Sequence, residues 1–529
     1  MSTAVKMDVE SEYDEVRFPQ ERTPGLVLGL TGEQLVVMGI GVAVGMAFIL
    51  RGGPSLVVGL VFFVVFGILG AVRFRGRSMP GWIAVALRYL RRGSSEQLSY
   101  RQGLSPAHEL TLVDGEPQAV VMDAVPKAER DAKGVIKPGQ PTRFRLPGVT
   151  GELMVYALPN GAGFVWDPRA REAVVVAKVM TSRGFNLESF DAQEERSLSW
   201  GAALAAMSRL PGVVRIQASD QTTLISGADV QGFYEGKQEA AGITGEQIDP
   251  FLDAAFHELM REAQSMPVHE QWLSLVVSPA KITSQLRALG GGMPALMEQM
   301  SKLMATVEGA LPRSGTRVTA WHSPRTLAGL SRAAFDPDAA LMVSATDLTG
   351  AAVGTAPTSA GPMAVETHPG HLITDGNMHR TYKVSELPQD VARLGFLDEL
   401  VFSGDFRHTV TVYMSPVDRG AAVRSVQRRM ASWSSDSSFL RKLGRPHSIE
   451  HDQTLEDIQR ERAELRRRHT GMDMVVLVTV TGRSQSELES AANEVVTAAI
   501  TSGCEVRPIW LEQDAAFIAA ALPFGRIKL

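Results

Sequence analysis

Two long apolar segments near the start of the chain constrain its fold most strongly. Leu35–Leu50 and Pro54–Val72 contain no ionisable residue, and only Arg51-Gly52-Gly53 separates them. As helices they would be about 24 Å and 28 Å long, close to the roughly 30 Å hydrocarbon core of a bilayer. The pattern predicts a transmembrane hairpin of two helices. The alternative is a helical hairpin buried inside a soluble core.

The flanking charges predict an orientation for this hairpin. Six arginines follow the second segment, and the connecting loop has one: Arg73, Arg75, Arg77, Arg88, Arg91 and Arg92 against Arg51. The positive-inside rule then places both termini in the cytoplasm, in a multi-pass protein of the inner membrane. The first 33 residues carry seven acids and three bases, unlike a signal peptide.

Two further patterns refine this region. Gly41 and Gly45 form a GxxxG pair, which lets two apolar helices pack closely. Apolar residues recur at helical spacing beside the arginines: Trp82, Ile83, Ala86, Leu87 and Leu90. They predict an amphipathic helix on the inner membrane face.

Composition excludes several classes of protein. The 529 residues include 58 acids and 53 bases, so no chain-wide basic field predicts direct nucleic-acid binding. The single cysteine, Cys504, excludes an internal disulfide framework and a cysteine-only zinc site, and we expect it in the core.

The remaining pattern predicts an α+β fold in five regions. These are an acidic N-terminal arm (1–33), the transmembrane hairpin with its juxtamembrane helix (34–92), a linker or extended segment (93–145), a first α+β domain (146–338) and a second one (339–529). Strands at Glu152–Leu158, Gly163–Asp167 and Glu172–Val179 form a predicted meander.

A strand followed by Ser-Pro and a helix occurs three times in the predicted α+β domains. The pairs are Ser278-Pro279, Ser323-Pro324 and Ser415-Pro416. Serine is a natural N-cap and proline suits the first helical position. The repetition predicts cytoplasmic ferredoxin-like halves, and a duplication would account for it.

Residues that would carry chemistry are scarce. A phosphate-binding loop needs G-x-x-x-x-G-K-[ST], but Gly236-Lys237 is followed by Gln238 and preceded by Gln231 at the first glycine position. We therefore expect no ATP hydrolysis. We predict no catalytic, cofactor-binding or metal-binding residue, no cofactor, and no enzyme activity.

Histidines offer two weaker metal patterns. His447 to His451 matches H-x-x-E-H, which places two histidines on one helical face for zinc, although a solvated loop is the alternative. His368-Pro369-Gly370-His371, with His379 nearby, is better explained as a hairpin turn than as a metal site.

Two helical features are candidates for partner contact. Four methionines recur along one helical face, at Met293, Met297, Met300 and Met304, a spacing that is also typical of a packing face. Thr454–His469 is a charged helix that includes Arg466–Arg468.

The residues from Asp375 onward resemble the N-terminal domain of the TraC-type conjugative ATPase. The resemblance lies in Asp375–Val384, Glu386-Leu387-Pro388, Ser415–Asp418, Met474–Thr481, Ser486-Glu487-Leu488, Gln513–Phe517 and Leu522–Gly525. In that family the motor domain follows these elements. Here the chain stops four residues after Gly525, so we expect no motor.

The chain as a whole, with Phe335–Asp338, resembles an actinobacterial membrane protein family associated with conjugation and type IV secretion. Its front end resembles the PrgI-type membrane subunit. These resemblances imply a non-catalytic inner-membrane scaffold subunit that docks a separate secretion or conjugation ATPase. Its other partners would be further membrane subunits, the lipid bilayer and, in a homo-oligomer, copies of itself. Alternatives are a core subunit of a type VII secretion system and a membrane-bound metallopeptidase using His447 and His451.

Overall fold

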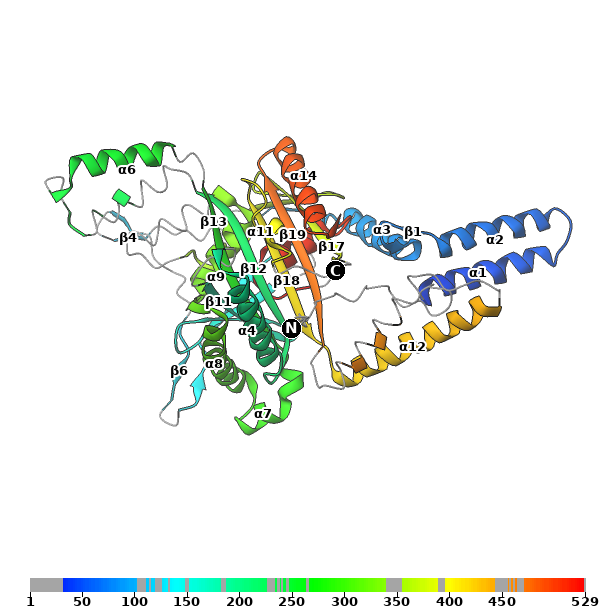
Figure 1. Cartoon of the computed structure of the whole chain (residues 1–529), viewed down its shortest axis with the longest axis horizontal. Helices are drawn as coiled ribbons and strands as arrows, with labels where there is room; N and C mark the ends of the chain where they lie inside the picture. Colours follow the sequence, from blue (N-terminus) through cyan, green and yellow to red (C-terminus); the bar gives the residue numbers. More distant parts are fainter. Residues whose placement is uncertain are drawn as a thin grey trace, which may run out of the picture.

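The computed structural model is an α+β protein built on one large antiparallel sheet (Figure 1). It describes residues 32–101, 111–113, 116–118, 126–131, 134–147, 152–181, 187–225, 247–262, 266–338, 354–388, 395–442 and 471–527, with a few residues between 234 and 243 and between 455 and 463. The predicted α+β class is therefore confirmed.

Helices α1 (Gly32–Ile49) and α2 (Ser55–Ala71) project from the sheet and pack against each other (Figure 1). Glycines make the close approach possible, as predicted. A Cβ atom on Gly41 would lie 2.2 Å from Cβ of Phe66, and one on Gly45 would lie 3.0 Å from the carbonyl oxygen of Gly59.

The expected multi-pass location in the inner membrane, with both termini cytoplasmic, is wrong. Among the described residues only α1 is long and apolar enough to cross a membrane. Helix α2 has 17 residues, about 25 Å, which falls short of the hydrocarbon core. The rest of the described chain is a large, sheet-rich body.

The arginines after α2 have a different role from the predicted one. Arg77, Arg88 and Arg92 pair with carboxylates of the body, so their clustering reflects contacts within the protein. The amphipathic helix itself is present as α3 (Met79–Ser94), capped by Ser78, whose Oγ accepts a hydrogen bond from the Gly81 amide at 3.3 Å.

The large sheet runs through both halves of the chain. Its order is β3-β15-β16-β17-β19-β18-β12-β13-β11-β10-β9-β8, with β14 also paired to β11 and β20 to β17. The strands are β3 (Ser99–Arg101), β8 (Thr142–Arg145), β9 (Glu152–Ala157), β10 (Gly163–Asp167), β11 (Glu172–Thr181), β12 (Val213–Ile225), β13 (Met266–Val277), β14 (Thr316–Trp321), β15 (Ala364–Thr367), β16 (Leu372–Thr374), β17 (Asn377–Glu386), β18 (His408–Pro416), β19 (Met472–Gly482) and β20 (Glu505–Pro508). The predicted meander is confirmed as β9, β10 and β11.

The same strand order occurs twice within this sheet. We call β11–β14 unit 1 and β17–β20 unit 2. Unit 1 has the spatial order β12-β13-β11-β14, and unit 2 has β18-β19-β17-β20. In each unit the second strand is therefore at one edge and the fourth strand at the other. The two second strands, β12 and β18, pair from Ile216↔Met414 to Thr222↔His408 and join the units.

Each unit also carries an insertion between its second and third strands. In unit 1 it contains helix α6 (Pro250–Glu262), and in unit 2 it contains helix α12 (Arg419–Lys442). Because β12 and β18 are antiparallel neighbours, the two insertions leave opposite ends of the sheet. Figure 1 shows α6 and α12 projecting in opposite directions.

Helices cover both faces of the sheet. Helices α4 (Phe190–Ser208) and α8 (Gly292–Ala310) cover one face of unit 1, and α14 (Gln485–Thr501) covers the same face of unit 2 with α11 (Asp398–Val401). The opposite face carries α9 (Pro324–Phe335) and α15 (Gln513–Ala521). Val412 packs in the cores of both units on the first face, so the two cores are continuous.

The three Ser-Pro pairs have different outcomes. Ser323 caps α9, its Oγ accepting a hydrogen bond from the Thr326 amide at 3.2 Å. Pro279 begins a short 3₁₀ helix that leads into α7 (Thr283–Ala288). At Ser415 the prediction is wrong: Ser415 and Pro416 still belong to β18, and Asp418 caps α12 instead, accepting from the Ala421 amide at 3.0 Å.

The expected regional boundaries remain predictions, but several residues lie where they were not expected. Within the predicted linker 93–145, β3 and β8 belong to the large sheet, and Phe144 is fully buried. The predicted domains 146–338 and 339–529 contribute to the same sheet. Of the predicted acidic arm 1–33, only Gly32 and Glu33 are described.

Candidate functional site

Helix α15 (Gln513–Ala521) begins with two polar residues and is almost completely buried. Gln513 and Asp514 at its start are 0% and 1% exposed, and Ala516–Ala521 are buried against the sheet. Gln513 binds the backbone of β17. Its Oε1 accepts from the Thr381 amide at 2.9 Å, and its Nε2 donates to the carbonyl oxygens of Thr381 at 3.2 Å and Ile509 at 2.6 Å.

The start of α15 binds the helix that follows the apolar pair. Arg92 of α3 forms a bidentate ion pair with Asp514. Arg77 Nη1 lies 3.2 Å from Glu512 Oε2, and Arg88 Nη2 lies 3.1 Å from Glu512 Oε1. Carboxylates at a helix N-terminus are stabilised by the helix dipole, so these acids suit both α15 and the arginines.

Three further contacts hold the same junction. The guanidinium carbon of Arg75 lies 4.6 Å from the Trp510 ring centroid, within the range of a cation–π interaction. The Tyr89 hydroxyl donates to the carbonyl oxygen of Thr367 at 3.3 Å. Strand β3 then pairs with β15, from Ser99↔Glu366 to Arg101↔Ala364. The segment from Arg75 to Arg101 is therefore attached at several points to β15 and to residues 510–514, which flank unit 2 in the sequence.

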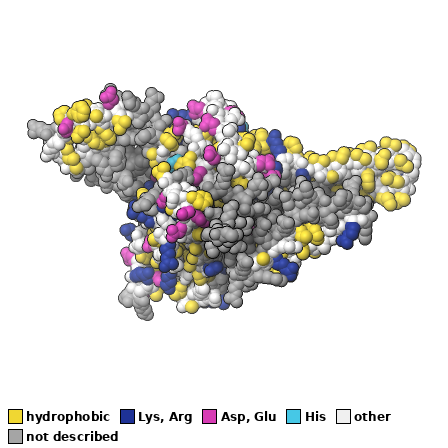
Figure 2. Space-filling model, in the orientation of Figure 1, with side chains coloured by type: hydrophobic (Ala, Val, Ile, Leu, Met, Phe, Trp, Pro, Cys, Tyr) yellow, Lys and Arg dark blue, Asp and Glu magenta, His cyan; other side chains and the backbone are white. Residues whose placement is uncertain are grey.

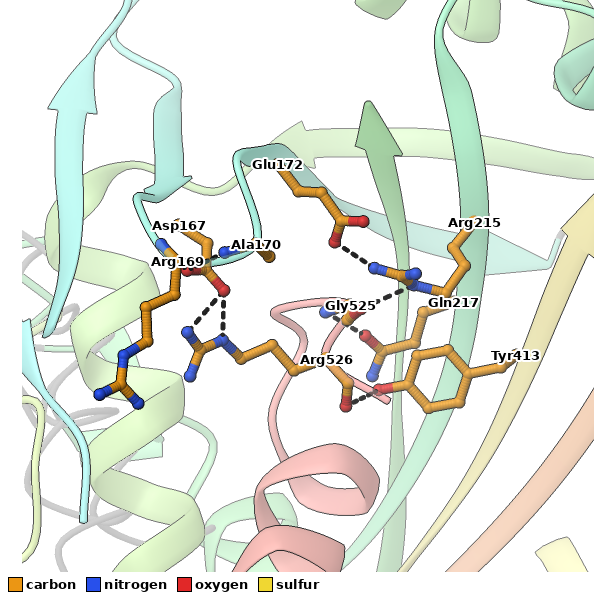
Figure 3. A network of polar contacts seen from close by, with 9 residues as sticks. All are labelled: Asp167, Arg169, Ala170, Glu172, Arg215, Gln217, Tyr413, Gly525 and Arg526. Carbon is orange, nitrogen blue, oxygen red and sulfur yellow. Dashed lines mark hydrogen bonds and ion pairs between the residues drawn. The ribbon is translucent and has the colours of Figure 1, made fainter. Parts of the chain in front are cut away.

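The segment after α15 is attached to unit 1 (Figure 3). Gln217 of β12 accepts from the Gly525 amide at 2.8 Å, and its Nε2 donates to the carbonyl oxygen of Leu522 at 2.9 Å. Arg215 Nε donates to the carbonyl oxygen of Gly525 at 3.0 Å. Ser274 of β13 donates to the carbonyl oxygen of Pro523 at 2.7 Å. Every one of these bonds satisfies backbone that would otherwise be buried without a partner.

Two ion pairs and one tyrosine complete this network. Arg526 Nε lies 2.8 Å from Asp167 Oδ2, and Asp167 Oδ1 accepts from the Arg169 and Ala170 amides at 2.9 and 3.0 Å. Arg215 pairs with Glu172. The hydroxyl of Tyr413, on β18, donates to Ala519 O at 2.7 Å and also lies 3.2 Å from Arg526 O. Burial raises the pKa of Tyr413 far above its usual value, so it stays a neutral donor.

These contacts connect three parts of the protein through α15. Helix α15 and the segment to Arg526, which we call the α15 segment, bind α3, unit 2 and unit 1 through buried hydrogen bonds and ion pairs. Backbone groups and counter-charges bind these buried polar side chains, which orders the elements relative to one another.

The predicted metal patterns do not form metal sites in the described chain. His368 and His371 flank the turn between β15 and β16, the His368 amide donating to His371 O at 2.9 Å, so the predicted hairpin is confirmed. His379 is buried between Thr374 Oγ1 at 2.6 Å and Thr481 Oγ1 at 2.9 Å. No cluster of three metal-ligating side chains occurs among the described residues. His447 and His451 lie outside them.

The two helical features expected to contact a partner have different outcomes. Met297, Met300 and Met304 are buried in the core under α8, and Met293 packs against it, so a partner groove at the methionine face is wrong. Thr454–His469, with Arg466–Arg468, lies largely outside the described residues, although Ile458 is buried against Ala422 and Val426 of α12.

Cys504 is in the core as predicted, and burial raises its pKa to about 11.

Sequence reasoning missed the residues that make the junction. No local sequence pattern predicts a role for Glu512, Gln217 or Tyr413. Asp514 appears only within Gln513–Phe517, one of the segments that resemble the conjugative ATPase domain. The available signal was the placement of Gln513-Asp514 directly before the apolar run Ala515–Ala521, where charged residues are expected to be exposed unless they are paired.

Comparison with known proteins assigns no family to this geometry. No protein-family model and no curated protein matches the chain.

Proposed function

We propose that this chain is a non-catalytic scaffold subunit of a type IV-like secretion or conjugation machine that docks a separate ATPase. The observation that carries the proposal is the α15 segment, which ties α3, unit 2 and unit 1 together through buried polar contacts. A scaffold needs such fixed relations between its parts. The resemblance of Asp375–Val384 and Gln513–Phe517 to conjugative ATPase N-terminal domains supplies the class of machine.

The repeated strand order supports a finer proposal for the fold. A ferredoxin-like unit has the sequence βαββαβ with its second and fourth strands at the edges. Unit 1 follows this sequence with α4 and α8 as its helices, and unit 2 follows it with α11 and α14. We propose that the body is a pair of ferredoxin-like halves joined through β12 and β18.

Lipid is the proposed partner of the apolar helices. Val36 and Met46 of α1, and Leu50 directly after it, have exposed side chains, and no described part of the sheet covers this helix (Figure 2). Apolar surface of this extent is stabilised by removal from water. Flotation of the full-length chain with anionic lipid vesicles tests this proposal. A chain that stays at the bottom of the gradient contradicts it.

The proposed ATPase docking is tested by crosslinking in native cells followed by affinity capture and mass spectrometry. We expect a secretion or conjugation ATPase among the captured proteins, and the purified chain is expected to hydrolyse no ATP. Capture of a type VII ATPase would assign the chain to that system instead. Capture without any secretion or conjugation ATPase contradicts the proposal.

Two arginine variants make the test sharper. Arg92→Ala breaks the buried pair with Asp514, whereas Arg88→Ala removes a mostly exposed partner of Glu512 and serves as the matched control. Transfer or secretion is expected to fall more in the first variant. Equal transfer in both variants would show that the contact between α3 and α15 is not needed for the function.

A further inference from the structure

Helix α6 carries its large apolar side chains on its outward face. Phe251 is 79% exposed, and Leu252 and Leu259 are exposed beside it. The inward face is held by Tyr234, whose ring centroid lies 4.4 Å from that of Phe256 and whose hydroxyl donates to Asp253 Oδ1 at 3.1 Å. Figure 2 shows hydrophobic side chains gathered over α6 at the upper left. The apolar face therefore lacks a partner among the described residues of its own chain.

Acidic side chains border this face. Asp249, whose Oδ1 accepts from the Phe251 amide at 2.8 Å, is exposed at the start of α6. Glu258 is exposed next to Leu259. A surface that covers α6 must therefore offer apolar contact with positive charge beside it.

Helix α3 has this complementary character. Ile83, Leu87 and Leu90 are exposed at spacings of four and three residues, so they form one outward stripe. Arg91 is exposed beside the stripe. The opposite face of α3 binds the body through Tyr89 and Arg92, and the outward stripe is left available to a second molecule.

Charge decides which copies of these helices can pair. Two α6 faces would bring acids together, and two α3 faces would bring arginines together, whereas α6 against α3 brings opposite charges together. The two helices lie on opposite sides of the sheet along the long axis of the molecule (Figure 1). Contact between them must therefore be made by different copies of the chain.

We propose that α6 of one copy docks on α3 of a second copy, with Leu252 and Leu259 against Leu87 and Leu90. This contact is heterologous, so its repetition generates a ring or a filament. Two helices of this length bury less than the roughly 1,600 Å² of a standard stable interface, so the contact is weak between two copies and depends on repetition. The proposal goes beyond ATPase docking and does not depend on it.

Disulfide crosslinking in cells tests the contact in the full-length chain. Two differently tagged variants, Leu87→Cys and Leu252→Cys, are co-expressed and oxidised. The single native cysteine, Cys504, is buried and gives little background. We expect a covalent species that carries both tags. Leu198→Cys replaces an exposed leucine of α4 and is the matched control, which should not crosslink to Leu87→Cys.

Each other outcome contradicts the proposal. Crosslinking of Leu252→Cys to itself would mean that two α6 faces pair. Absence of a two-tag species would mean that lipid or another protein covers these faces. Charge reversal provides a second measurement: Glu258→Arg and Arg91→Glu should each lower the yield about three-fold, as exposed ion pairs do, and their combination in opposite copies should restore it. A combination no better than either single variant also contradicts the proposal.

Discussion

Arg92 and Asp514 form a buried ion pair between residues 422 positions apart in the sequence. The Asp514 side chain is 1% exposed and that of Arg92 is 15% exposed. Removing one member of such a pair leaves a charge without compensation in a medium of low dielectric constant. The pair therefore makes the position of α3 depend on α15.

We expect Asp514→Asn to lower the free energy of unfolding by about 3 kcal/mol, because Arg92 then loses the carboxylate that neutralises its charge. Urea unfolding followed by tryptophan fluorescence measures this. Arg88→Ala is the control, and since Arg88 is mostly exposed its cost should stay within about 1 kcal/mol. Equal costs for both variants would contradict the role of the buried pair.

We expect Gly41→Val to separate α1 from α2. A Cβ atom at this position would lie 2.2 Å from Cβ of Phe66, so the helices must move apart. A disulfide between cysteines replacing Phe48 and Phe62, whose rings stack at 5.8 Å, reports the packing. Gly39→Val is the matched control, because nothing lies within 4 Å of its Cβ position. If the disulfide forms equally well with Gly41→Val and with Gly39→Val, the packing of α1 on α2 at Gly41 is contradicted.

Tyr413→Phe is expected to lower the free energy of unfolding by about 1–3 kcal/mol. The hydroxyl donates to the buried carbonyl oxygen of Ala519 at 2.7 Å, which then loses its donor. Thermal unfolding measures the change. Tyr100→Phe, at an exposed tyrosine of β3, should be nearly neutral. A neutral Tyr413→Phe would show that the α15 segment does not depend on this bond.

His379 should make stability fall as the pH is lowered. Burial lowers its pKa to about 3, against 6.5 in the unfolded chain. Below pH 6.5 the unfolded state binds a proton that the folded state does not, so its contribution is present above pH 6.5 and is lost as the pH falls toward 3. The loss is about 1.4 kcal/mol per pH unit. Urea unfolding at about pH 7 and pH 5.5 should show a smaller difference for His379→Gln than for the wild type. Equal differences would contradict the shifted pKa.

The sequence predicted well those strands and helix starts that depend on neighbouring residues alone. The predicted strands at β9, β10 and β11 agree with the observed ones to within two residues at each end. Ser323 before Pro324 caps α9 as predicted, accepting from the Thr326 amide at 3.2 Å. The Ser-Pro signal failed at Ser415 because Asp418, two residues after Pro416, is also a good N-cap and competes for the helix start.

Contacts between distant residues were beyond these patterns. Strand β12 continues to Ile225, although Ser219, Asp220 and Gln221 interrupt its apolar residues. On the face that packs against α15, Gln217 instead binds backbone at Leu522 and Gly525, so its polarity is required by a segment 300 residues away. The positive-inside rule misplaced the arginines of α3 for the same reason, since the carboxylate partners of Arg88 and Arg92 lie beyond residue 510.

The attachment of α3 to Glu512 and Asp514 sets an order of events during synthesis. A ribosome adds about 5–20 residues per second, so roughly 25 to 95 seconds separate the first apolar helix from these acids. Throughout this interval Arg88 and Arg92 of α3 lack their carboxylate partners, and β12 lacks the backbone that Gln217 binds. The sheet therefore reaches its final packing only after residues 512–526 have left the ribosome. The nascent chain must keep its apolar helices from aggregating until then.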